Sequence, residues 1–202
     1  MKKMFVTFVA IAALAAVGSV NAAGNIDAGK TKSQSCAACH GVNGVSATAM
    51  NPNLAGQSAA YLVKQLKEFK SKKRDNATMY GMAAGLSDQD MEDVAAYYAS
   101  QKAAESKADE TLVERGKLIY LSGDDSKGLS ACLGCHGPAG KGIPSAKFPA
   151  LAGQHADYTV SQLKAFSLGS RANDAGKMMQ TIAGKMNAAD MKAVASYIQG
   201  LR

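Results

Sequence analysis

The pentapeptide Cys-x-x-Cys-His occurs twice in this chain of 202 residues, at positions 36–40 and 132–136, and the two copies contain all four cysteines. Two thiols three positions apart can form thioethers with the two vinyl groups of one porphyrin, and the histidine that follows places an imidazole at the iron. The pattern therefore predicts two covalently bound haem c groups. The residues concerned are Cys36, Cys39 and His40, and Cys132, Cys135 and His136.

Three other uses of paired cysteines explain the pattern less well. One zinc finger would not separate its two cysteine pairs by about 90 residues. A thioredoxin-like redox pair needs a βαβ context, and the chain shows no strand pattern. Disulfides suit an oxidising compartment, but they do not explain a histidine directly after the second cysteine in both copies.

The N-terminus has the pattern of a secretory signal peptide. Lys2 and Lys3 precede an apolar stretch at 5–17, and small residues end at Ala22. We expect residues 1–22 to be removed, so that the mature chain begins at Ala23. The apolar stretch is shorter than the roughly 20 residues of a membrane span, so we expect an exported, soluble protein. An uncleaved anchor stays open as the alternative.

The mature chain contains an internal sequence repeat. Leu-Ala-Gly-Gln at 54–57 recurs at 151–154, and residues 54–74 match residues 151–171 at 12 of 21 positions without a gap. A repeat of this length indicates a duplicated domain. Each copy carries one Cys-x-x-Cys-His motif.

The segment at 100–109 is poor in large apolar residues and predicts the linker between the copies. We therefore expect one domain at 23–105 and a second at 106–202. Domains this small bury a limited core, so a large apolar haem would lie at the centre of each.

Apolar periodicity predicts an all-α fold. Residues 59–73 place apolar side chains on one helical face. Ser87 and Asn187, each followed three positions later by an aspartate, predict the starts of the last helix in each domain. Short helices are expected before each motif, at 27–35 and 111–121.

Gly29 and Gly116 fall inside these short helices. Glycine weakens a helix by about 1 kcal/mol relative to alanine. A close crossing with the C-terminal helix of each domain is one explanation for both glycines, and local chain flexibility is the other.

The formal charge of +7 gives little information about the binding partners of the protein. Without Lys2 and Lys3 the mature chain carries +5, with +1 on residues 23–105 and +4 on residues 106–202. The propionates of two haems would offset most of this excess, so the basic character does not indicate a nucleic-acid binder. The basic run at 70–74 is expected to be a solvated helix end, with a docking patch for an acidic partner as the alternative.

The sixth ligand decides whether each iron carries electrons or binds a substrate. Methionines are the main candidates, and alignment of the C-terminal helices pairs Met79 with Met179 and Met91 with Met191. The second pair lies within an apolar helical stripe, so core packing explains it. The first pair lies in a stretch that we expect to be an irregular loop over the haem face, so we predict Met79 and Met179 as ligands.

Two neighbours and one histidine are the alternative ligands. Met82 aligns with Ile182, and Met178 aligns with Thr78, so neither is repeated. His155 aligns with Ser58 and could serve only one domain, so we expect it to be a surface residue. A neutral thioether raises the reduction potential and closes the coordination sphere, which suits outer-sphere electron transfer.

A ligand histidine also needs an acceptor for its second ring nitrogen. Pro52 and Pro149 each lie two residues before Leu-Ala-Gly-Gln. Their carbonyl groups, held in a rigid turn, are the predicted acceptors. Proline could also simply end an extended segment there, because it restricts φ.

The chain resembles the dihaem cytochrome c4 family over its whole mature length. The resemblance rests on the tandem Cys-x-x-Cys-His motifs, Pro-Asn-Leu-Ala-Gly-Gln at 52–57, Phe-Pro-Ala-Leu-Ala-Gly-Gln at 148–154, Met-Tyr-Gly-Met at 79–82 and the ending at 196–201. It implies two class I cytochrome c folds packed face to face around a pseudo-twofold axis. It also implies iron ligation by His40 with Met79 and by His136 with Met179, with the carbonyl groups of Pro52 and Pro149 accepting the histidine hydrogen bonds.

Two departures concern the second copy. Met-Asn-Ala at 186–188 stands where the first copy has Leu-Ser-Asp, which affects a helix cap and not a ligand. Gly116 lies sixteen residues before Cys132, whereas Gly29 lies seven before Cys36, so the shape of the loop at 122–130 is not predicted.

The resemblance implies a periplasmic carrier that passes single electrons towards a terminal oxidase or another respiratory complex. We expect a monomer without a catalytic group, and a peripheral contact with the membrane stays open. One alternative is the electron-accepting subunit of a periplasmic dehydrogenase. Another is a dihaem peroxidase, which needs one iron with an open or displaceable ligand.

Overall fold

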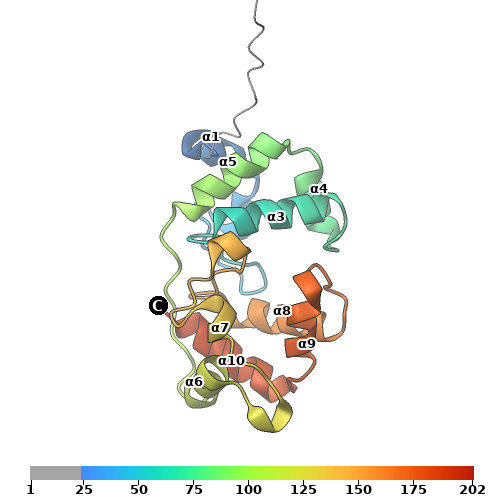
Figure 1. Ribbon diagram of the computed structural model, residues 1–202. Helices are drawn as coiled ribbons and strands as arrows, with labels where there is room; N and C mark the ends of the chain where they lie inside the picture. Colours follow the sequence, from blue (N-terminus) through green and yellow to red (C-terminus); the bar gives the residue numbers. More distant parts are fainter. Residues whose placement is uncertain (1–23) are drawn as a thin grey trace, which may run out of the picture.

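A computed structural model describes residues 24–202, and the expected signal peptide lies outside them. Within this range the chain is helical, and its extended pairing is confined to two isolated bridges, Asp124 with Leu129 and Ile143 with Phe148. The helices form two halves that follow each other along the chain (Figure 1). The predicted all-α fold is confirmed.

The first half contains five α-helices and one 3₁₀ turn. In chain order these are α1 (Ile26–Lys32), η1 (Ser33–Ser35), α2 (Ala37–His40), α3 (Ala59–Lys70), α4 (Ala77–Ala84) and α5 (Asp88–Ala99).

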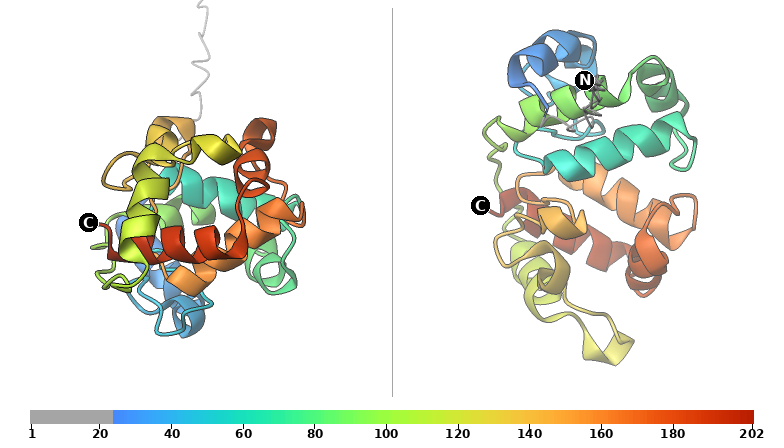
Figure 2. Two further views of the ribbon diagram at one scale, coloured as in Figure 1. Left: turned by 90° about the horizontal axis from the view of Figure 1, so that it is seen from below. Right: turned by 45° about the horizontal axis from the view of Figure 1, so that its top comes forward.

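The second half repeats the order of the α-helices and contains three 3₁₀ turns. Its elements are α6 (Val113–Ser122), η2 (Asp125–Lys127), α7 (Leu133–His136), η3 (Pro144–Ala146), α8 (Ala156–Ser167), η4 (Ala175–Lys177), α9 (Met178–Ala183) and α10 (Ala188–Gly200). The segment between α5 and α6 has no helix and runs alongside both halves (Figure 2).

Local sequence signals account for several helix ends. Ser87 and Asn187 each form a capping box with the aspartate three residues later, as the sequence predicts. Helix α3 ends at Lys70, earlier than the predicted end at 73. The reason is that Lys72 adopts a left-handed backbone with φ of 59°, which ends the helical path.

The two helix glycines mark close crossings, which confirms one of the two explanations from the sequence. A Cβ built on Gly29 would lie 2.0 Å from the carbonyl oxygen of Asp93 in α5. A Cβ built on Gly116 would lie 2.1 Å from that of Ala193 in α10. Each half therefore holds its first helix against its last by direct backbone contact.

Each half also has its own apolar core. In the first half this core includes Leu62, Val94 and Tyr98, and in the second it includes Ile119, Phe166 and Ile198. Met91 and Met191 are 0% and 4% exposed, which confirms their predicted packing role.

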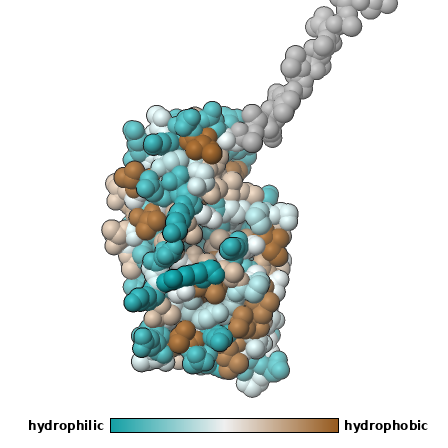
Figure 3. Space-filling model, turned by 90° about the vertical axis from the view of Figure 1, so that its left-hand side faces the viewer, coloured by the Kyte–Doolittle hydropathy of each residue, from teal (hydrophilic) through white to brown (hydrophobic). Residues whose placement is uncertain are grey.

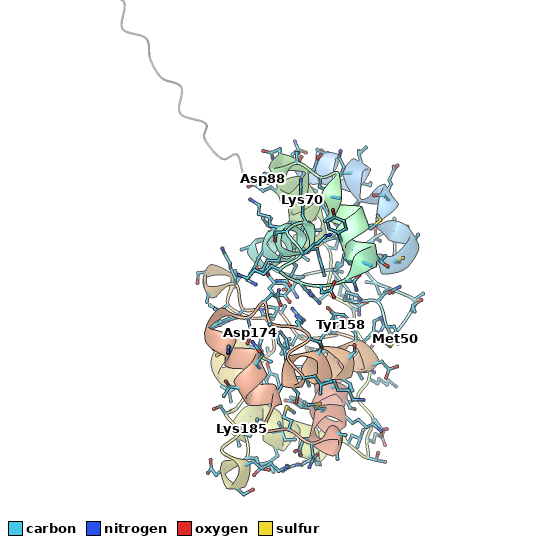
Figure 4. All side chains as sticks on the ribbon, turned by 90° about the vertical axis from the view of Figure 1, so that its right-hand side faces the viewer. Met50, Lys70, Asp88, Tyr158, Asp174 and Lys185 are labelled. Carbon is cyan, nitrogen blue, oxygen red and sulfur yellow. The ribbon has the colours of Figure 1, made fainter. Side chains whose placement is uncertain are left out.

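Helices α3 and α8 face each other across the junction between the halves (Figure 1). Arg74 donates to the hydroxyl of Tyr158 at 2.9 Å, and Arg171 donates to the hydroxyl of Tyr61 at 2.9 Å. Tyr158 lies at this junction in Figure 4. The two hydrogen bonds join aligned residues of the two copies in reciprocal fashion. The halves are therefore related by an approximate twofold arrangement.

The basic run at 70–74 therefore divides into two parts. Its three lysines are exposed, and Lys72 lies over the ring of Tyr80. Arg74 is only 9% exposed and belongs to the junction. The expectation of a solvated helix end is wrong for Arg74, because the side chains of the other half supply acceptors that the sequence pattern does not show.

The loop at 122–130 is held by ion pairs. Arg115 contacts Asp124 at 2.7 Å and Asp190 at 2.8 Å, and Lys127 also pairs with Asp190. Leu129 is buried in the core of the second half. The added loop is thereby fixed to the start of α10.

We expect Asp190→Asn to destabilise the second half by about 2 kcal/mol, because hydrogen bonds to charged groups contribute roughly 1.5–3 kcal/mol. Lys127, Arg115 and the backbone of Asn187 together hold the pKa of Asp190 below its usual value, although burial acts in the opposite direction. A depressed carboxyl pKa stabilises the fold above the unfolded pKa and loses that effect as pH falls. Thermal unfolding from pH 7 to pH 3 should therefore show a smaller acid dependence in this variant.

Among the described residues, no helix is both long enough and apolar enough to span a membrane.

Candidate functional site

The two Cys-x-x-Cys-His motifs form short helices at equivalent places in the two halves. Helix α2 ends with His40 and α7 ends with His136. The glycine after each histidine has positive φ, which turns the chain away from the motif. Both imidazoles are almost fully buried, with 8% and 7% exposure.

Each buried histidine contacts the proline carbonyl that the sequence suggests. Nδ1 of His40 lies 2.9 Å from the carbonyl oxygen of Pro52, and Nδ1 of His136 lies 3.0 Å from that of Pro149. When Nδ1 carries the proton and donates it, Nε2 keeps its lone pair and can bind a metal. Burial lowers the pKa of both histidines, which favours this neutral form, and the contact with the proline carbonyl opposes the shift.

Burial favours the neutral thiol at the first cysteine of each motif. The four cysteines form no disulfide with one another. Burial raises the pKa of Cys132 to about 11 and also raises that of Cys36. A zinc site would require thiolates, and the described residues contain no group of three His, Cys, Asp or Glu side chains that could hold a metal ion.

This donor set suits haem c. Each half offers two cysteine sulfurs for thioether bonds and one buried imidazole for the iron. Among the residues that the structure describes, none forms a hydrogen bond with the buried hydroxyl of Tyr98. Haem supplies one-electron chemistry when bound, while the protein orients the imidazole and excludes water.

The predicted methionines lie on helices. Met79 is in α4, which begins where the side chain of Asn76 accepts from the Met79 N–H at 2.9 Å. Met179 is in α9. The expectation of an irregular loop is therefore wrong at both positions, because a cap in one half and a 3₁₀ turn in the other start a helix there.

Burial distinguishes the predicted methionines from their neighbours. Met79 and Met179 are half-buried, and Met179 packs against the core of the second half. Met82 and Met178 are 38% and 40% exposed.

His155 is not the plain surface residue that we expected. Its Nε2 lies 3.0 Å from the carbonyl oxygen of Ser46, so it joins the second half to the first. The aligned Ser58 instead caps α3 by accepting from the Tyr61 N–H. The sequence pattern could not reveal a contact that depends on how the halves pack.

The sequence pattern also did not single out the polar groups of the junction. Gln162 accepts from Arg74 of the other half at 2.8 Å, and Gln65 accepts from Arg171 of the other half at 3.3 Å. All four residues are identical between the copies. Retention of polar residues within an otherwise diverged repeat was the signal that could have identified them.

Comparisons with known proteins agree with this geometry. The cytochrome c family matches residues 26–102 and 113–202. Cytochrome c4 of Pseudomonas aeruginosa is 45% identical over 202 residues and covers 100% of both chains. The thiosulfate dehydrogenase electron acceptor of Thiomonas intermedia is 40% identical over 168 residues, which is 81% of this chain and 77% of that protein.

A solved structure shows the same arrangement. Reduced recombinant cytochrome c4 from Pseudomonas stutzeri has a TM-score of 0.86 and 44% identity, covering 89% of this chain and 100% of that one. Full-length similarity and the doubled haem motif confirm the predicted resemblance. The chain therefore belongs to the cytochrome c4 family, whose members are electron carriers with two covalently bound haem c groups.

Proposed function

We propose that this protein carries single electrons in the periplasm towards a terminal oxidase, with His40 and Met79 ligating one iron and His136 and Met179 the other. The observation that carries the proposal is the repeated geometry of a buried histidine whose Nδ1 contacts a proline carbonyl. Two closed irons exchange electrons without binding a substrate. The signal-peptide pattern of residues 1–22 supports export, and the proposed mature domains are 23–105 and 106–202.

A second candidate partner is a periplasmic dehydrogenase that donates electrons to this protein. The similarity to a thiosulfate dehydrogenase electron acceptor supports it. The two roles are compatible, because a carrier needs both a donor and an acceptor.

Exposed apolar side chains near the first motif suggest where a partner docks. Val42, Val45 and Met50 are 71%, 46% and 60% exposed. Figure 4 places Met50 at the edge of the molecule, at the level of the junction marked by Tyr158. On the face shown in Figure 3, apolar residues form small groups among hydrophilic ones, which suits transient contact.

Rapid mixing of the reduced protein with oxidase-containing membranes tests the proposal. We expect both haems to be reoxidised, and cyanide to stop the reaction. Val42→Glu should slow reoxidation at least about threefold, since a charge within a docking contact is unfavourable. Leu168→Glu, at an 82% exposed site in the second half, is the matched control.

Two results would contradict the proposal. Membranes that leave the protein reduced would exclude the oxidase as its acceptor, whether or not thiosulfate dehydrogenase reduces the protein. Equal slowing in both glutamate variants would exclude docking at the first motif.

A further inference from the structure

The repeated Leu-Ala-Gly-Gln segment places one glutamine of each half against the other half. The Nε2 of Gln57 donates to the carbonyl oxygen of Ala150 at 2.8 Å, and the Ala150 N–H donates to Oε1 of Gln57 at 2.9 Å. In the reciprocal contact, Nε2 of Gln154 donates to the carbonyl oxygen of Asn53 at 2.9 Å, and the Asn53 N–H donates to Oε1 of Gln154 at 2.8 Å. Each glutamine thus pairs with both backbone groups of one residue across the junction.

The peptide groups contacted in this way are the ones that face the motif histidines. The Asn53 N–H and the Pro52 carbonyl belong to a single peptide group, and that carbonyl lies 2.9 Å from Nδ1 of His40. In the second half, the Ala150 N–H and the Pro149 carbonyl form the peptide group next to His136. A short chain of hydrogen bonds therefore runs from the glutamine of one half to the histidine of the other.

Such a chain has a definite electronic effect. A peptide that donates through its N–H becomes a stronger acceptor at its carbonyl, because hydrogen bonds in series polarise one another. A stronger acceptor at Nδ1 makes the imidazole more electron-rich and fixes its ring orientation. An electron-rich axial ligand favours ferric iron and lowers the reduction potential.

We propose that Gln57 and Gln154 are crossed positioning residues: Gln154 lowers the reduction potential of the first haem and Gln57 that of the second. The inference rests on the proposed ligation by His40 and His136. It gives the junction a role in setting the two potentials, beyond holding the halves together.

The junction is not symmetric around these glutamines. The side chain of Asn53 donates to the carbonyl oxygen of Gly153 at 2.9 Å and accepts from the Ser46 N–H at 2.9 Å. The aligned Ala150 has no such side chain. The side chain of Asn53 therefore still holds the loop of the first half when the Gln154 side chain is removed. For this reason Gln154→Leu should disturb the loop beside the histidine less than Gln57→Leu does.

Potentiometric titration of the full dihaem protein tests the proposal, with each potential assigned from the NMR resonances of its haem. Gln154→Leu should shift the ferric–ferrous equilibrium of the first haem about threefold towards ferrous iron and leave the second unchanged. At 59 mV for a tenfold change, this is a rise of about 30 mV. Gln57→Leu should shift only the second haem.

Hydrogen exchange gives a readout that does not involve the iron. Protection of the Asn53 amide should fall in Gln154→Leu, and that of the Ala150 amide should fall in Gln57→Leu. His155→Ala is the control for a loosened junction, because it loses only the contact with the carbonyl of Ser46. Both potentials should be unchanged in that control.

A shift in the haem of the same half, no shift at all, or the same shift in His155→Ala would overturn the inference. The ligation is checked separately in the unmodified protein, where His40 and His136 should give hyperfine-shifted imidazole resonances. Their absence would refute the ligation itself, whatever the glutamine variants show.

Discussion

Met79→Ala and Met179→Ala should each abolish about half of the near-infrared absorption that methionine-to-iron ligation gives the ferric protein. Each substitution removes a neutral thioether that favours ferrous iron, so the potential of the affected haem should fall. We expect a fall on the order of 0.1–0.2 V, because axial ligand identity spans about 0.8 V among haem proteins. Absorption spectra and a redox titration of each variant measure both effects.

Matched controls lie beside each proposed ligand. Met82→Ala and Met178→Ala remove methionines that are 38% and 40% exposed. These variants should keep the full near-infrared band and both potentials. If Met79→Ala keeps the full band while Met82→Ala loses half of it, the ligand of the first haem is Met82.

Gly29→Ala and Gly116→Ala should each destabilise their half of the protein by about 1–3 kcal/mol, the usual range for overpacking a tight contact. The added methyl group would meet a backbone carbonyl oxygen at 2.0 Å or 2.1 Å, and a backbone carbonyl cannot turn aside as a flexible side chain can. Helix α1 would have to move away from α5, or α6 away from α10. Denaturant unfolding measures the change in free energy.

Gly85→Ala is the control for this prediction. Gly85 ends α4 with φ of −85°, and a Cβ there would have no neighbour within 4 Å. Alanine at this position should stabilise the protein by about 0.4–1 kcal/mol, because it restricts the unfolded chain. Equal stability of Gly116→Ala and the unmodified protein would show that the α6–α10 crossing can open without cost.

Sequence patterns were sufficient wherever the physics is local. The capping boxes at Ser87 and Asn187 involve residues three positions apart, so both helix starts could be predicted. Haem attachment depends on two cysteines and a histidine within one pentapeptide, so the cofactor was also evident. The duplication then allowed the methionines to be compared between copies.

The same patterns misjudged positions whose surroundings come from elsewhere in the chain. Arg74 follows three exposed lysines and has the pattern of a helix end, yet it is buried against Tyr158 of the other half. The stretch around Met79 lacks strong periodicity, but Asn76 caps a helix there.

The sequence by itself therefore determined the two haem sites, the helical class and the duplication, because each depends on residues close together in the chain or repeated along it. Only the tertiary structure decided how the copies meet. Gln57 and Gln154 lie 97 positions apart, and each pairs with a backbone group of the opposite half. Such pairing depends on the packing of two complete domains, which no local spacing of residues encodes.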